Sequence, residues 1–167
     1  NKLELKFQEN SLNETDAYTL HISDATQLAG LPEGTIETAA ETAKEHGKEG
    51  WIFTLHRPSY IPFLTFSTNR ELRKELYLAY SSLGAKGDKY DNRAIVVQIV
   101  NTRLELANLL GYSTYSEYIT SGRMAQTPDA VFSLLGRLTW SYLPTARREV
   151  DEIRALACEI EGEEFEM

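Results

Sequence analysis

The sequence predicts a mainly α-helical protein, a multi-helix, bundle-like segment with a minor two-stranded β element. Three observations predict this fold class. After residue 69, apolar residues recur every three or four positions, as they do on one face of a helix. Residues 18–22 alternate with period two, and residues 51–55 are rich in aromatic and β-branched side chains, so both segments suit short strands. Capping residues, glycines and prolines stand where helices should begin and end.

The chain opens with a helical spacing of apolar residues at Leu3, Phe7 and Leu12. We therefore expect the end of a helix over residues 3–13, followed by the first strand. Ser23 or Asp24 can cap a short turn before Gly30. Pro32 suits the first turn of a helix that reaches about His46. The second strand follows, and the sequence leaves open whether the two strands form a parallel pair or a hairpin-like ribbon.

Three further helices are predicted between residues 69 and 121. The first ends before Gly84, and a loop over residues 84–90 follows it. Asp91 or Asn92 can cap the second helix, which Gly111 ends. Its buried side should carry Ile95, Ile99, Leu106, Ala107 and Leu110. The third is a short helix opened by the capping-box pattern of residues 114–117.

The longest predicted helix begins at Thr127, with Pro128 in its first position and Asp129 in its first turn. Its apolar stripe is Val131, Leu135, Leu138, Tyr142, Ala146, Val150, Ile153, Ala157 and Ile160. Pro144 should kink this helix or divide it in two. We expect residues 1–167 to form a single helical segment or lobe of a larger enzyme. Residues 1–66 would be mixed with short strands and residues 67–167 all helical.

The composition is ordinary for a soluble globular protein, with 42% hydrophobic and 25% charged residues. A net charge of −8 argues against nucleic acid as a partner. The basic residues at 70, 73 and 74 are interleaved with Glu71 and Glu75, which is typical of a solvated helix face. No apolar run reaches the roughly 20 residues of a membrane span. The single thiol, Cys158, favours a reducing compartment, and we expect a cytoplasmic protein.

The sequence matches none of the motifs that we compared with it for catalytic and metal sites. We therefore expect no catalytic, cofactor-binding or metal-binding residue here. The three histidines, His21, His46 and His56, are scattered, and no His-Glu-x-x-His spacing occurs. His21 and His56 fall on predicted strands, so their rings could approach each other if the strands pair. Cys158 lies beside an apolar helix position, where packing explains it. No Gly-x-Ser-x-Gly elbow is present.

Weaker patterns have plain structural interpretations. The glycine-containing loop at residues 84–88 lacks the Gly-Lys-Ser/Thr ending of a phosphate loop. Carboxylate pairs occur at Glu41 with Glu45 and at Glu163 with Glu164, and solvated helix faces account for them. The tyrosines at 112, 115 and 118 could form a binding stripe, but a helix-packing ridge is the simpler interpretation. The acidic stretch from Glu159 to Met167 has no stop signal, as expected either of a helix cut in passing or of a frayed boundary.

Three blocks of sequence, in order and spacing, resemble a known family. The first block joins Thr19-Leu20-His21-Ile22 to residues 28–33; the second comprises Gly50-Trp51-Ile52-Phe53-Thr54-Leu55 with residues 58–64 and 69–74; the third comprises Asp91-Asn92, Leu109-Leu110-Gly111-Tyr112, Met124-Ala125 and Thr127-Pro128. The ordered set resembles the zinc metallopeptidases that include thimet oligopeptidase, oligopeptidase A and the bacterial peptidyl-dipeptidases.

The resemblance implies a larger enzyme, mostly helical, with a deep and narrow channel for short peptides. Zinc would be held by a His-Glu-x-x-His helix and a later glutamate, with the glutamate of the motif as general base. None of these positions has a counterpart here, so the resemblance transfers no catalytic or metal residue. This chain would be an upstream scaffold that is inactive alone, with short peptides and the rest of the parent chain as partners and self-association when isolated.

Two other interpretations stay open at this stage. One is a non-catalytic helical module that binds partner helices in a hydrophobic groove. The other is a small zinc-binding protein that uses His21 and His56.

Overall fold

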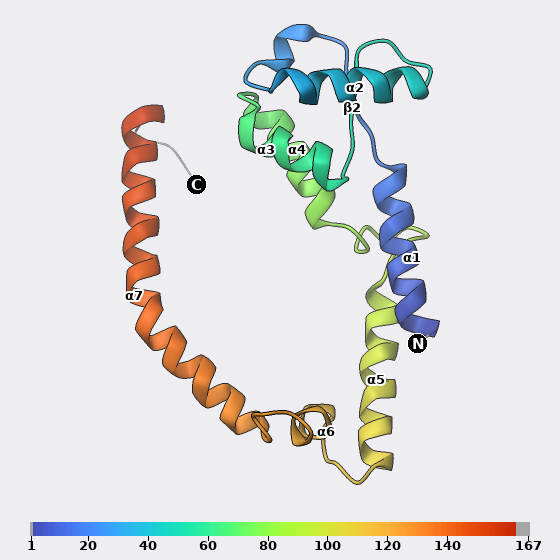
Figure 1. Ribbon diagram of the computed structural model, residues 1–167, viewed down its shortest axis with the longest axis vertical. Coiled ribbons are helices and arrows are strands. Elements are labelled where there is room, and N and C mark those ends of the chain that lie inside the picture. The colour runs from blue at the N-terminus through green and yellow to red at the C-terminus, as the bar shows by residue number, and fades with distance from the viewer. Residues whose placement is uncertain (1, 163–167) are drawn as a thin grey trace. The chain divides into compact units, whose positions relative to one another are not determined.

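A computed structural model describes residues 2–162 and confirms the predicted fold class (Figure 1). Within these residues the elements are α1 (Lys2–Ala17), β1 (Leu20–Ile22), the 3-10 helix η1 (Ala25–Leu28), α2 (Glu33–Glu45), β2 (Trp51–Phe53), α3 (Arg57–Phe66), α4 (Arg70–Ser81), α5 (Arg93–Leu109), α6 (Tyr115–Ser121) and α7 (Pro128–Glu161). The chain forms two compact units, which meet in sequence between Asn101 and Thr102. Each unit is described by itself.

Several helix starts have side-chain caps, and those of η1, α6 and α7 follow the prediction from the sequence. The side chains of Asp24, Asn69 and Thr127 each accept a hydrogen bond from a backbone N–H two or three residues ahead. Thr114 and Glu117 form the full capping box of α6. These bonds satisfy N–H groups that have no partner inside the helix. Pro32 is the residue before α2 rather than the first residue inside it.

The two strands pair in antiparallel fashion, which decides the question that the sequence left open. Leu20 lies opposite Phe53, and Ile22 lies opposite Trp51. Gly50 leads into β2 with φ +92°, and a Cβ there would stand 2.4 Å from the carbonyl oxygen of Ile22. Only glycine fits both this backbone conformation and this close approach.

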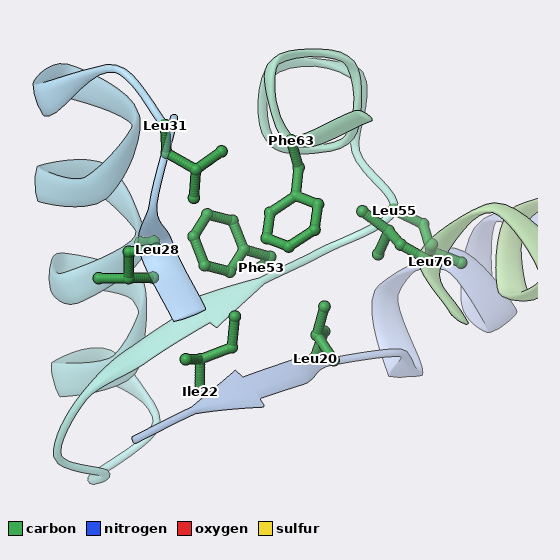
Figure 2. Close-up of a cluster of buried hydrophobic side chains, with 9 residues drawn as sticks. Leu20, Ile22, Leu28, Leu31, Phe53, Leu55, Phe63 and Leu76 are labelled. Atoms are coloured by element: carbon green, nitrogen blue, oxygen red, sulfur yellow. The ribbon is translucent and has the colours of Figure 1, made fainter. Parts of the chain in front are cut away.

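The first unit has one apolar core, built on the inner face of this ribbon (Figure 2). It consists of Leu20, Ile22, Leu28, Leu31, Ala39, Phe53, Leu55, Phe63 and Leu76. The rings of Phe53 and Phe63 meet edge to face, with centroids 4.6 Å apart. Helices α2, α3 and α4 therefore share a core with both strands.

Helix α3 is absent from the sequence prediction, which placed His56 on a strand instead. The structure ends β2 at Phe53 and makes His56 the residue before α3. The His56 carbonyl accepts hydrogen bonds from the backbone N–H groups of Ser59 and Tyr60, which closes the first turn. The sequence pattern did not indicate this helix because it contains two prolines four residues apart, Pro58 and Pro62. A proline in the first turn costs no hydrogen bond, and Phe63 fixes the helix on the core.

Helix α5 buries less than its sequence pattern predicts. Ala107 is buried and Ile95 and Ile99 are half-buried, whereas Leu106 and Leu110 are exposed. Asn92 does not cap this helix with its side chain, which bonds to α1 instead. Asp91 accepts from the backbone N–H of Arg93.

Helix α7 is continuous from Pro128 to Glu161, so Pro144 does not divide it. Its ribbon changes direction about midway, as the predicted kink requires (Figure 1). None of its described residues is buried. No helix in the described part of the chain is long and apolar enough to cross a membrane.

Candidate functional site

The three histidines lie in three different settings. One ring nitrogen of His21, in β1, is 2.7 Å from the carbonyl oxygen of Glu49. His46 follows α2 and contacts the carbonyl oxygen of Thr42 at 2.8 Å. His56 is exposed and contacts Asp16, with Nε2 and Oδ1 3.0 Å apart. Each ring therefore has a partner within its own neighbourhood.

Strand pairing does not bring His21 and His56 into register. His21 lies opposite Ile52, and His56 lies four residues further along the chain, beyond the end of β2. Among residues 2–162 there is no group of three His, Cys, Asp or Glu side chains that could hold a metal ion. The donors present in this part of the chain do not fit a catalytic zinc site, which needs three protein ligands on one ion.

The most elaborate polar structure joins α1 to the loop between α4 and α5. Asn92 is buried, and its Nδ2 donates to the Phe7 carbonyl oxygen and the Ser11 hydroxyl, each at 3.1 Å. Its Oδ1 accepts from Nδ2 of the buried Asn10 at 3.0 Å. This side chain gives Nδ2 of the buried Asn10 its acceptor and ties α1 to the loop before α5.

Glu14, one turn further along α1, fixes the loop itself. Its carboxylate is buried, accepts from the backbone N–H of Gly84 and forms an ion pair with Lys86 at 2.9 Å. Gly84 has φ +72° and packs against Asn92. A phosphate would need the same N–H and ammonium groups, which an internal carboxylate already uses. The geometry therefore supports the interpretation of this segment as an inter-helix loop.

The sequence pattern did not predict this cluster of buried polar side chains. Asn10 and Glu14 are four residues apart on one face of α1, and that spacing was the only local signal available. Their partners are 70 to 82 positions away in sequence, so the contacts depend on the tertiary fold.

Shifted pKa values occur beside this loop and elsewhere in the first unit. Hydrogen bonds from Arg93 hold the pKa of the half-buried Asp91 carboxyl at about 2. Burial, together with the nearby Glu75 carboxylate, raises the pKa of Tyr18 to about 12. The Lys86 ammonium lies 5.9 Å from the ring centroid of Tyr18. The Asp91 shift follows from hydrogen bonds within the loop, and the Tyr18 shift follows from burial and from Glu75 on α4.

The other sequence candidates lie apart from any such cluster. Tyr118 contacts Tyr112 and Tyr115, with ring centroids 5.5 and 5.9 Å apart, and the three rings are half-buried, as in a packing ridge. Glu41 and Glu45 are exposed on α2, and Cys158 is half-buried on α7. Glu163 and Glu164, and the acidic end after Gly162, lie outside the described residues.

Comparison with known proteins identifies the family of this chain. The family model "Peptidase family M3" matches residues 63–167, and the chain therefore belongs to peptidase family M3. The relatives include oligopeptidase A of Haemophilus influenzae, 37% identical over 164 residues that cover 96% of this chain and 24% of that protein. Dipeptidyl carboxypeptidase of Escherichia coli is 30% identical over 161 residues, which cover 95% of this chain and 23% of that protein. Saccharolysin of Saccharomyces cerevisiae is 29% identical over 136 residues, covering 80% and 18%.

This chain thus spans about a quarter of the length of the relatives that it matches, so the activity of the whole protein is a matter for proposal. The family membership agrees with the resemblance that the three sequence blocks predicted.

Proposed function

We propose that this chain is a scaffold segment of a zinc-dependent oligopeptidase or peptidyl-dipeptidase that hydrolyses short peptides. The observation that carries the proposal is the family match over residues 63–167, together with relatives named oligopeptidase A and dipeptidyl carboxypeptidase. The segment supplies no zinc ligand in this proposal, and the metal site lies in the remainder of the parent enzyme. Residues 1–167 then belong to one lobe of that enzyme.

The internal structure of the first unit supports a scaffold role. Its central side chains are apolar and packed against each other, and its buried polar groups bond to each other across α1 and the loop before α5. A wall built in this way holds its shape. No step of the peptidase reaction is therefore assigned to these residues.

The substrates, partners and compartment of the parent follow from the same proposal. Its substrates are short peptides, its zinc would supply Lewis-acid chemistry from a site outside this chain, and its partners include neither nucleic acid nor membrane. We place it in the cytoplasm, in agreement with the single unpaired thiol at Cys158.

The test uses the full-length protein and this chain in parallel. The full-length protein should contain a His-Glu-x-x-His helix outside residues 1–167 and should cleave quenched fluorescent peptides of five to ten residues, with loss of activity in a chelator and recovery with zinc. The 167-residue chain should show no cleavage with zinc supplied. An intact parent without the motif, or chelator-sensitive cleavage by the 167-residue chain, contradicts the proposal.

A second candidate function rests on the exposed apolar side chains of α7. A free-standing interaction module would use that helix to bind a partner helix. It predicts that the apolar surface of α7 stays accessible in the full-length protein, whereas the scaffold proposal predicts that the parent covers it.

A further inference from the structure

Helix α7 carries two apolar stripes rather than one. At roughly 100° per residue, the first stripe follows the whole helix, and it is the stripe predicted from the sequence. The second stripe occurs only before Pro144 and consists of Phe132, Gly136, Trp140 and Leu143. It lies roughly a third of a turn around the helix from the first. Together the stripes cover roughly two thirds of the circumference before Pro144, and the first stripe alone covers roughly one third after it.

The two halves of α7 also differ in charge. Residues 130–143 include one charged side chain, Arg137, whereas residues 145–161 include eight. A helix with one apolar stripe and many charges lies on a protein surface, and a helix that is apolar over most of its circumference is surrounded by other elements. The sequence therefore describes a helix that enters a core on one side of Pro144 and runs along a surface on the other.

The second stripe has no cover within this unit. The exposed fraction is 71% for Phe132 and 83% for Trp140, and a Cβ built on Gly136 meets no atom within 4 Å. Exposed aromatic rings next to a glycine form a surface that another backbone can approach closely.

We propose that the stripe of Phe132, Gly136, Trp140 and Leu143 is the docking surface for an apolar segment of this protein's own chain from outside the 167 residues. The inference rests on the proposed function, in which this chain is part of a longer peptidase. The matched length supports this occupant, because the chain covers only 24% of oligopeptidase A of Haemophilus influenzae. A protein of that length has ample chain to enclose both stripes.

A second copy of this chain is the weaker occupant on geometric grounds. A two-fold partner covers one patch of a helix, and it would leave the other stripe in water. Two stripes that point in different directions need neighbours on two sides, as a helix inside a folded domain has. The end of the second stripe at Pro144 is then the point where α7 leaves that core.

The experiment measures thiol accessibility in the full-length protein, in a background where its native thiols, Cys158 included, are replaced. Trp140→Cys reports on the second stripe. Glu152→Cys is the matched control, because the Glu152 side chain is 69% exposed on the charged side of the same helix. Each variant is labelled with a water-soluble maleimide in native buffer and in urea. We expect the native rate to be at least about 100-fold below the urea rate for Trp140→Cys, and within about threefold for Glu152→Cys.

Equal labelling of the two cysteines in native buffer overturns the inference. Protection of Trp140→Cys that disappears on dilution also overturns it, because a second copy is then the cover. Equal protection of this thiol in the 167-residue chain overturns it as well, because the first unit is then the cover. If Trp140→Cys does not fold, Leu143→Cys probes the same stripe with a smaller change in volume, and the same outcomes apply.

Peptide cleavage, measured on the same preparations, separates this inference from the proposed function. An active peptidase with a reactive Trp140→Cys thiol refutes the docking surface alone. A protected thiol in a full-length protein that lacks peptidase activity retains the docking surface and refutes the proposed function.

Discussion

Replacement of Phe63 by alanine should remove a large part of the stability of the first unit. The Phe63 side chain is fully buried, and its ring meets that of Phe53 edge to face at 4.6 Å. Deletion of a buried phenylalanine side chain costs about 3–5 kcal/mol, and loss of the ring pair accounts for about 1 kcal/mol of that. A unit of this size has a free energy of unfolding of roughly 5–15 kcal/mol. We therefore expect Phe63→Ala to lower it by about 4 kcal/mol.

Urea denaturation followed by tryptophan fluorescence measures this loss. Trp51 packs against the core of the first unit, so its emission reports on that core. Trp140 lies in the second unit and is replaced by phenylalanine in every protein compared. The matched control is Phe66→Ala on the same helix, because Phe66 is 51% exposed. We expect this control to change the free energy of unfolding by less than about 1 kcal/mol.

A loss below about 1 kcal/mol for Phe63→Ala would refute the assignment of α3 to the core. Equal losses for Phe63→Ala and Phe66→Ala would refute the placement of one side of α3 against the strands. A changed slope of the urea transition would show that the mutation acts on the unfolded chain as well.

Three further predictions use the same urea assay. Asn92→Ala should lower the free energy of unfolding by about 1–3 kcal/mol, because it leaves Nδ2 of the buried Asn10 without its acceptor, and a change under about 0.5 kcal/mol contradicts this role. Gly50→Ala should cost at least about 2 kcal/mol, since a Cβ would stand 2.4 Å from the Ile22 carbonyl oxygen, whereas Gly34→Ala in an open helical position should be neutral or stabilising. Burial raises the pKa of Tyr18 from 10.0 to about 12. The contribution of the protonated Tyr18 side chain to the free energy of unfolding is therefore complete below pH 10 and is lost as the pH rises toward 12. Tyr18→Phe should reduce this alkaline loss, and an unchanged profile of unfolding free energy between pH 9 and pH 12 would count against it.

Local chemistry explains why the sequence predicted most of the helix starts. Asp24, Asn69, Thr114 and Thr127 cap their helices through bonds to residues two or three positions ahead, and such bonds depend on little beyond the local chain. The mainly helical class and the two strands followed from periodicity for the same reason. The family resemblance also needed only ordered blocks of sequence.

Long-range packing decided the features that the sequence analysis missed. Helix α3 exists despite Pro62 because Phe63 reaches the core shared with the strands. The antiparallel pairing of β1 with β2, and the bonds from α1 to the loop before α5, join residues far apart in sequence. No local pattern predicts such partners, because the two residues of each contact come together only in the folded chain.

Helix α7 shows the same division within a single element. Its start, its apolar stripe and the bend expected of Pro144 follow from local sequence. The extent to which its apolar side chains stay uncovered became visible only in the folded structure, because burial depends on neighbours and not on periodicity. The sequence alone thus determined the helical class, the helix starts other than that of α3, and the family of this protein. The tertiary structure decided the strand pairing, the buried polar contacts and the exposure of α7, because each depends on residues brought together from distant parts of the chain.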